Sequence, residues 1–124
     1  MVAIEWTSNH ELGVQPMDHT HKEFIQLYNR LANAQDADFP AYFNELIAHT
    51  MAHFGQENLW MDESGFPPAV IHHCEHERVL NLMRAAQRDV AAGDIDAGRG
   101  FAAQLPAWFG QHAATMDTAL ATHM

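Results

Sequence analysis

Residues 43–61 read FNELIAHTMAHFGQENLWM, and their apolar residues recur at steps of three and four positions. That period is typical of an amphipathic helix, whose apolar face packs on a core. His53 and Glu57 lie four residues apart on the same face, so they stack one above the other along the helix. The stretch therefore predicts a helix that turns an imidazole and a carboxylate toward the interior. The residues of this face are Phe43, Leu46, Ile47, Thr50, His53, Phe54, Glu57 and Met61.

Three other stretches repeat this period, one before residues 43–61 and two after them. Four amphipathic helices with short connections and no strand-like alternation predict a single all-α domain over residues 1–124. We expect an up-down-up-down four-helix bundle over residues 18–124, preceded by an extended N-terminal arm over residues 1–17. The three other faces carry His21, Phe24, Leu27, Tyr28 and Leu31; His72, His76, Val79, Leu80, Met83 and Val90; and Phe101, Leu105, Trp108, Phe109, His112, Met116 and Leu120.

The last of these helices contains two irregular points. Pro106 lies inside the helical pattern and removes one backbone hydrogen bond, so we expect a kink or a restart over residues 102–106. His112 and Asp117 are five residues apart, and on an ideal helix they diverge by about 140°. If both face one site, the spacing predicts a π-type turn between Gly110 and Asp117.

The composition excludes several classes of function. The 124 residues include 16 acidic and 6 basic ones, for a formal charge of −10, and no basic stripe that could neutralise phosphates. We therefore expect neither nucleic-acid binding nor a polybasic membrane anchor. No run approaches the roughly 18 apolar residues that span a bilayer, and the first residues lack the pattern of a signal peptide. The single cysteine, Cys74, cannot form an intrachain disulfide, so these features together predict a cytoplasmic protein.

Histidine is unusually frequent, with 10 residues, and five of them lie on predicted apolar faces together with two carboxylates. Each unsatisfied buried polar group costs about 1–3 kcal/mol, whereas a whole domain is stable by only about 5–15 kcal/mol. The seven groups must therefore either pair with one another or surround a cation. Seven donors exceed the four that one zinc ion takes, so they suit two ions bridged by carboxylates, and imidazole with carboxylate favours iron. The seven residues are His21, His53, Glu57, His72, His76, His112 and Asp117.

The seven candidate ligands lie within a set of short sequence motifs that together span nearly the whole chain. It consists of Trp6 with Gly13-Val14; Asp18-His19-Thr20-His21-Lys22; His53-Phe54-Gly55-Gln56-Glu57; Met61 with Gly65-Phe66-Pro67; His72-His73-Cys74-Glu75-His76; and Trp108-Phe109-Gly110-Gln111-His112 with Asp117. With these segments in this order, the sequence resembles the hemerythrin family, and most closely its single-domain bacterial members, the bacteriohemerythrins. All seven candidate ligand positions of the family are filled.

The resemblance implies a non-haem di-iron centre. Glu57 and Asp117 would bridge the two ions together with an oxo or hydroxo group, and one coordination position would stay open on the iron that has two histidines. In the family, dioxygen binds end-on at that position to the diferrous centre and is held reversibly as a hydroperoxide. The three-histidine iron would be bound by His72, His76 and His112, and the two-histidine iron by His21 and His53.

An oxygen pocket is expected around the open position. Phe109 stands where the family often has an aliphatic residue, and Ala113 stands where isoleucine is common, so the two together would reshape the pocket. Asn58 stands where a second glutamate is common. The other predicted walls of the pocket, each of which also suits the core, are Phe24, Phe54 and Trp108.

The leading interpretation is a non-enzymatic protein that binds dioxygen reversibly for storage, transport or sensing. Two alternatives stay open: a di-iron oxidase or an enzyme that processes nitric oxide or peroxide, and a signalling module that responds to iron or redox state. Met124 follows the fourth predicted helix directly, so a fused output domain is not expected. The expected ligand is dioxygen, with nitric oxide and small anions such as azide as alternatives. We expect a monomer or a weak oligomer, and leave a delivery or signalling partner open.

Overall fold

The computed structural model describes residue 4 and residues 12–124, and the described part of the chain forms helices joined by turns. Residues 1–3 and 5–11, with Trp6 among them, lie outside the described residues. No helix within the described part is long and apolar enough to cross a membrane. The elements are α1 (Gln15–Ala32), α2 (Phe39–Ser64), α3 (Ala69–Ala91), α4 (Ile95–Ala102), α5 (Leu105–His112), the π-helical segment η2 (Ala113–Asp117) and α6 (Thr118–His123).

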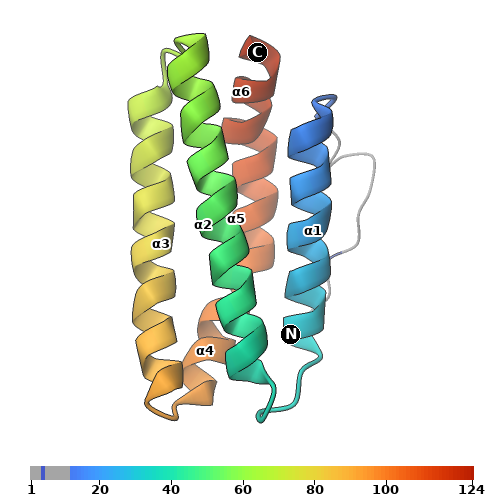
Figure 1. Ribbon diagram of the computed structural model, residues 1–124, viewed down its shortest axis with the longest axis vertical. Helices are drawn as coiled ribbons and strands as arrows, with labels where there is room; N and C mark the ends of the chain where they lie inside the picture. Colours follow the sequence, from blue (N-terminus) through green and yellow to red (C-terminus); the bar gives the residue numbers. More distant parts are fainter. Residues whose placement is uncertain (1–3, 5–11) are drawn as a thin grey trace.

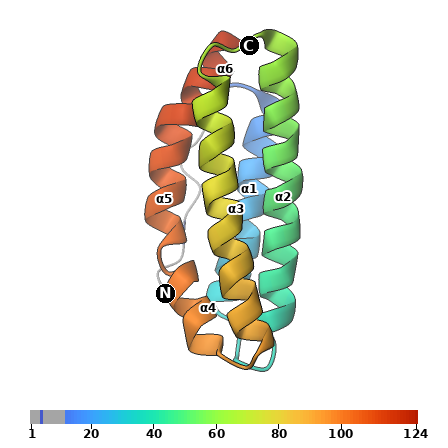
Figure 2. The ribbon, with the colours of Figure 1, turned by 90° about the vertical axis from the view of Figure 1, so that its left-hand side faces the viewer.

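Four rods run side by side along the long axis of the molecule (Figure 1). Three of them are α1, α2 and α3, and the fourth is formed by α5, η2 and α6 in succession. The short helix α4 lies at the end of the bundle where the chain passes from α3 to the fourth rod (Figure 2). Successive rods run in opposite directions, which confirms the predicted up-down-up-down four-helix bundle.

Helix α1 starts earlier than predicted. It begins at Gln15, so the expected arm over residues 1–17 extends three residues too far. Pro16 lies in the first turn of α1, where its fixed φ suits the helix and no backbone N–H is required. The Asp18 carboxylate accepts a hydrogen bond of 2.8 Å from the N–H of Leu12, which holds the preceding residues against the start of the helix. A proline disrupts a helix only beyond its first turn, so Pro16 begins α1 rather than delaying it.

Both predicted irregularities of the last helix are present. Helix α4 ends at Ala102, and α5 begins at Leu105 with Pro106 in its first turn, so the chain restarts its helix where the proline requires it. The five-residue step from His112 to Asp117 is taken up by η2, in which the chain is π-helical. The wider π turn brings the side chains at both ends of this step to the same side of the rod.

The buried apolar side chains form two clusters, one above and one below a polar layer. On α1, for example, Met17 belongs to the smaller cluster, His21 to the polar layer and Phe24 to the larger cluster. The α2 rod and the fourth rod show the same succession, and Phe66, just before α3, completes the smaller cluster, so apolar side chains close the polar layer at both ends of the bundle axis. The polar groups are therefore held in a medium of low dielectric constant, where unpaired charge is costly. The smaller cluster consists of Met17, Met61, Phe66 and Leu120.

Candidate metal centre

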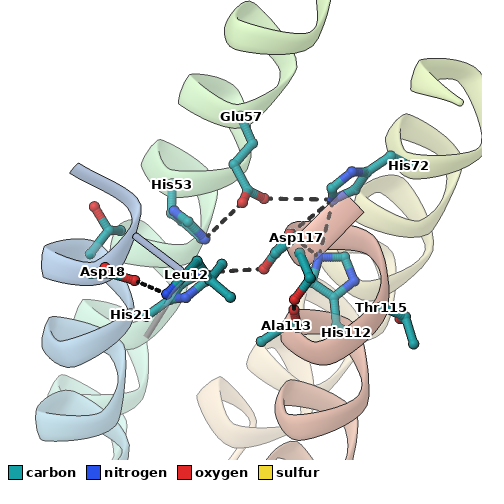
Figure 3. A network of polar contacts seen from close by, with 12 residues as sticks. Leu12, Asp18, His21, His53, Glu57, His72, His112, Ala113, Thr115 and Asp117 are labelled. Carbon is teal, nitrogen blue, oxygen red and sulfur yellow. Dashed lines mark hydrogen bonds and ion pairs between the residues drawn. The ribbon is translucent and has the colours of Figure 1, made fainter. Parts of the chain in front are cut away.

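All seven predicted ligand side chains meet in this polar layer. Each rod contributes at least one of them, and none is more than 9% exposed. Figure 3 shows the two carboxylates, Glu57 and Asp117, between histidines of α1 and α2 on one side and histidines of α3 and α5 on the other. Helix α1 supplies His21, α2 supplies His53 and Glu57, α3 supplies His72 and His76, α5 supplies His112, and η2 supplies Asp117.

Five of the donors form one compact group, which we call the five-donor set: Glu57, His72, His76, His112 and Asp117, with ligand atoms within 4.8 Å of one another. Oε1 of Glu57 lies 3.0 Å from Nε2 of His76 and 3.7 Å from Nε2 of His72. Oδ1 of Asp117 lies 3.2 Å from Nε2 of His72 and 3.1 Å from Nε2 of His112. The five-donor set therefore presents three imidazoles and one oxygen from each carboxylate to a common point.

A second group, the four-donor set, consists of His21, His53 and the same two carboxylates, again with ligand atoms within 4.8 Å. Oδ2 of Asp117 lies 3.1 Å from Nε2 of His21, and Oε2 of Glu57 lies 3.6 Å from Nε2 of His53. Each carboxylate thus turns one oxygen toward each set, which is how a carboxylate bridges two ions. These are the same two groups of residues that the hemerythrin resemblance implies.

Most of the donor atoms are buried and lack hydrogen-bond partners within the described residues, whereas Nε2 of His72 lies 3.2 Å from Nε2 of His112, within hydrogen-bonding distance. Although imidazole nitrogens and carboxylate oxygens approach to 3.0–3.7 Å, most of these contacts do not have the directions of hydrogen bonds. Donor atoms held about 2.0–2.2 Å from one cation are themselves about 3–3.5 Å apart, which matches this spacing. A cation in each set would satisfy these atoms together, so the residues present fit a metal centre. The unpartnered atoms include both oxygens of Glu57 and of Asp117, Nε2 of His21 and Nε2 of His76.

The electrostatics of the layer also favour bound cations. Burial and neighbouring imidazoles lower the pKa of His53 to about 3 and that of His76 to about 2, so both are neutral, the form that binds metals. Burial and the neighbouring Asp117 raise the pKa of Glu57 well above its usual value. Burial also acts to raise the pKa of Asp117, but the imidazoles of His112, His21 and His72 hold it well below its usual range. Two ionised carboxylates are thus costly in this buried layer, and cations would stabilise both.

These pKa values predict that the metal-free protein loses stability in acid. Between pH 6.5 and about 3, the unfolded chain protonates His53 and His76 while the folded chain does not, so unfolding is favoured as the pH falls. The raised pKa of Glu57 acts in the opposite direction above pH 4.5, but it is one group against two. We expect the thermal midpoint of metal-free protein, followed by circular dichroism, to drop steadily below pH 6.5.

A double variant, His53→Gln with His76→Gln, provides the control. It should lose most of this slope because glutamine does not titrate. A parent protein whose midpoint stays constant over the same pH range would show that these imidazoles are not buried in the neutral form.

Asn58 orients one of the imidazoles. Nδ1 of His76 lies 2.9 Å from Oδ1 of Asn58. Because an amide oxygen only accepts, Nδ1 carries the proton and Nε2 is left free to bind a metal. The ring of Phe54 stacks on His76 with centroids 3.9 Å apart and fixes the ring plane. The sequence marks Asn58 only as a departure from the family, because its contact depends on how α2 packs against α3.

Trp108 orients a second imidazole. Its ring stacks on His112 with centroids 4.6 Å apart and planes inclined by 19°. The indole N–H donates a 2.8 Å hydrogen bond to Oε1 of Glu75, which also accepts from Arg78. The hydrogen bond from Arg78 is the main reason that the pKa of Glu75 falls to about 2, so the indole donates to a charged carboxylate. Trp108 therefore positions His112, a contribution beyond the pocket wall that the sequence suggests.

A small cavity of about 10 Å³ lies against the donor sets. Four of the five predicted pocket residues line it, and Ala113 does not, although Ala113 is buried nearby. Thr50 also lines the cavity, and its hydroxyl donates a 2.8 Å hydrogen bond to the carbonyl of Leu46. Because that hydroxyl is occupied, the cavity wall is apolar apart from the side chains of the donor sets. The lining residues are Phe24, Thr50, His53, Phe54, Trp108, Phe109, His112 and Asp117.

The fold and the site together define a metal-binding four-helix bundle with a buried layer of histidine and carboxylate donors. Residues 12–123 match the family described as "Hemerythrin HHE cation binding domain". The chain belongs to the hemerythrin family.

Similar proteins agree with this assignment. The chain is 41% identical over 122 residues to a bacteriohemerythrin of Ralstonia nicotianae, and the matched region covers 98% of this chain and 89% of that protein. It is 26% identical over 116 residues to a bacteriohemerythrin of Pseudomonas aeruginosa, covering 90% of this chain and 75% of that protein. A crystal structure of a hemerythrin L114A mutant superimposes with a TM-score of 0.90 at 20% identity, covering 99% of this chain and 98% of that one. The last comparison supports the fold alone.

Proposed function

We propose that this protein binds dioxygen reversibly at a non-haem di-iron centre. The observation that carries the proposal is the pair of donor sets, which share Glu57 and Asp117 but differ by one imidazole. Family membership and the similarity to bacteriohemerythrins support the same function. Two ferrous ions would supply the electrons that a reversibly bound dioxygen molecule requires.

The two donor sets would offer the two ions different numbers of protein ligands. The five-donor set would hold one ion through three imidazoles and an oxygen of each carboxylate. The four-donor set would hold the other through two imidazoles and the remaining carboxylate oxygens. The four-donor set therefore offers one protein donor fewer, so the ion bound there would have a coordination position open to an external ligand.

The cavity beside the donor sets suits a very small uncharged ligand. Its volume of about 10 Å³ favours a very small ligand over an organic substrate, and Phe24, Phe54 and Phe109 give it apolar walls. Among the lining residues, no side chain apart from the donors is an acid or a base that could transfer protons to a substrate. These features favour reversible binding of dioxygen over substrate oxidation.

The experiment that tests the proposal follows one sample through a cycle. The iron-loaded protein is reduced without oxygen, exposed to oxygen and then returned to an oxygen-free atmosphere. We expect a visible charge-transfer band that appears with oxygen and disappears on its removal over repeated cycles. Rapid irreversible oxidation with release of peroxide would contradict reversible binding and would support the oxidase alternative.

Phe109 is expected to shield the oxygenated form of the protein from water. Its ring stacks on Phe24 with centroids 4.8 Å apart and meets His21 edge-on at 5.3 Å. Phe109→Ala would open the cavity to solvent, so the rate of autoxidation should rise several-fold while the iron content stays at that of the parent. Stopped-flow spectroscopy of the oxygenated form measures this rate. The matched control is Phe101→Ala, which truncates an aromatic ring of α4 at the other end of the larger cluster; equal rates in both variants would refute the role of Phe109.

A further inference from the structure

Among the described residues, four histidines lie outside the two donor sets: His19, His49, His73 and His123. Two of them, from different helices, meet at one carboxylate oxygen. Nε2 of His19 lies 3.5 Å from Oε1 of Glu23, and Nε2 of His49 lies 3.8 Å from the same atom. His19 and Glu23 are four residues apart on α1, and His49 comes from α2. The packing of α1 on α2 thus gathers two imidazoles and a carboxylate at one place.

The distance from Oε1 of Glu23 to each imidazole is near that between two ligands of a tetrahedral cation. Ligand atoms about 2.0–2.1 Å from a zinc-like ion are about 3.4 Å apart, and the two distances from Oε1 of Glu23 to the imidazoles, 3.5 and 3.8 Å, are close to this value. The three donors do not yet close around one point as the two buried sets do. The His19 side chain is 77% exposed, so it is free to rotate and complete the set, while the His49 side chain is only 16% exposed and is held in place.

The surroundings give a cation access to these residues. An open cleft between α1 and α2, of about 500 Å³, is lined by Glu23 and His49. Arg30, which also lines it, is paired with Glu45, so its charge is balanced. The formal charge of −10 further favours cations over anions at the surface. Two imidazoles with one carboxylate select a divalent transition-metal ion rather than calcium or magnesium, which take oxygen ligands.

We propose that His19, Glu23 and His49 form an outer site that binds one divalent transition-metal cation on the α1–α2 face. The outer site is distinct from the buried centre but close to it. His49 precedes His53 by one helical turn, and their rings stack with centroids 6.4 Å apart. A cation bound to His49 at the outer site would therefore be separated from the four-donor set by the stacked rings of His49 and His53.

The test counts metal ions on protein whose buried centre is already filled with iron. The iron-loaded protein is dialysed against increasing concentrations of Zn²⁺, and zinc and iron are measured together. We expect one zinc ion per chain in addition to the iron, with the iron content unchanged. In His19→Ala and in Glu23→Gln, which alter exposed or half-exposed side chains, zinc affinity at this site should fall at least about tenfold.

The matched control is His73→Ala. His73 is also a histidine outside the donor sets, and it forms an ion pair with the carboxylate of Asp62 at 3.5 Å. This variant should bind the additional zinc ion as the parent does. Binding of no additional zinc by the parent would overturn the proposal and leave these residues as ordinary ion pairs. Equal zinc affinity in the parent, His19→Ala and Glu23→Gln would overturn it as well.

Discussion

His112→Ala is expected to reduce the iron content to less than two ions per chain and to abolish the spectrum of the oxygenated form. His112 belongs to the five-donor set alone, and its Nε2 lies 3.1 Å from Oδ1 of Asp117. Alanine removes one of three imidazoles and leaves four donors, so the affinity for that ion should fall strongly while the four-donor set stays complete. Elemental analysis and the visible spectrum of the same sample measure both effects.

The control for this variant is His73→Ala, which removes a half-buried histidine of α3 that belongs to neither donor set. It should retain the iron content and spectrum of the parent. If His112→Ala also keeps two iron ions and the full spectrum, His112 does not bind the metal, and the assignment of the five-donor set fails.

Glu57→Gln is expected to have a larger effect, because Glu57 belongs to both sets. Its Oε1 faces His76 at 3.0 Å and its Oε2 faces His53 at 3.6 Å. Glutamine keeps the shape but has no negative charge, and only one of its two terminal atoms can bind a metal. Both ions should therefore be lost, so the iron content should fall below that of His112→Ala.

The same variant separates metal binding from folding. Burial raises the pKa of Glu57 well above its usual value, so ionising it at neutral pH costs stability when no cation is present. The metal-free Glu57→Gln protein should therefore be at least as stable as the metal-free parent in thermal unfolding. Glu63→Gln, at an exposed position of the same helix, is the control and should leave the iron content unchanged. Two iron ions per chain in Glu57→Gln would contradict a bridging role for this carboxylate.

The irregularities of the fourth rod were predictable because each has a local cause. Pro106 cannot donate a backbone hydrogen bond, so a break near it follows from covalent structure. The five-residue step between His112 and Asp117 predicts η2 once both residues are assigned to one site. The start of α1 was predicted less well, because Pro16 is compatible both with an extended arm and with a first helical turn.

The arrangement within the site depends on contacts between helices, which periodicity does not determine. Periodicity places Glu57 on an apolar face, but only the packing of four rods shows that its two oxygens face different groups of histidines. The contact between Asn58 and His76 requires a particular register of α2 against α3. The meeting of His19 and His49 at Glu23 likewise requires the register of α1 against α2.

The most direct test of the central claim is a difference map from crystals of the iron-loaded protein, recorded with anomalous scattering at the iron absorption edge. We predict two iron peaks in the polar layer, one among the atoms of each donor set, with Glu57 and Asp117 in contact with both. A single peak, or iron bound elsewhere while the seven side chains stay free, would contradict a shared dinuclear centre.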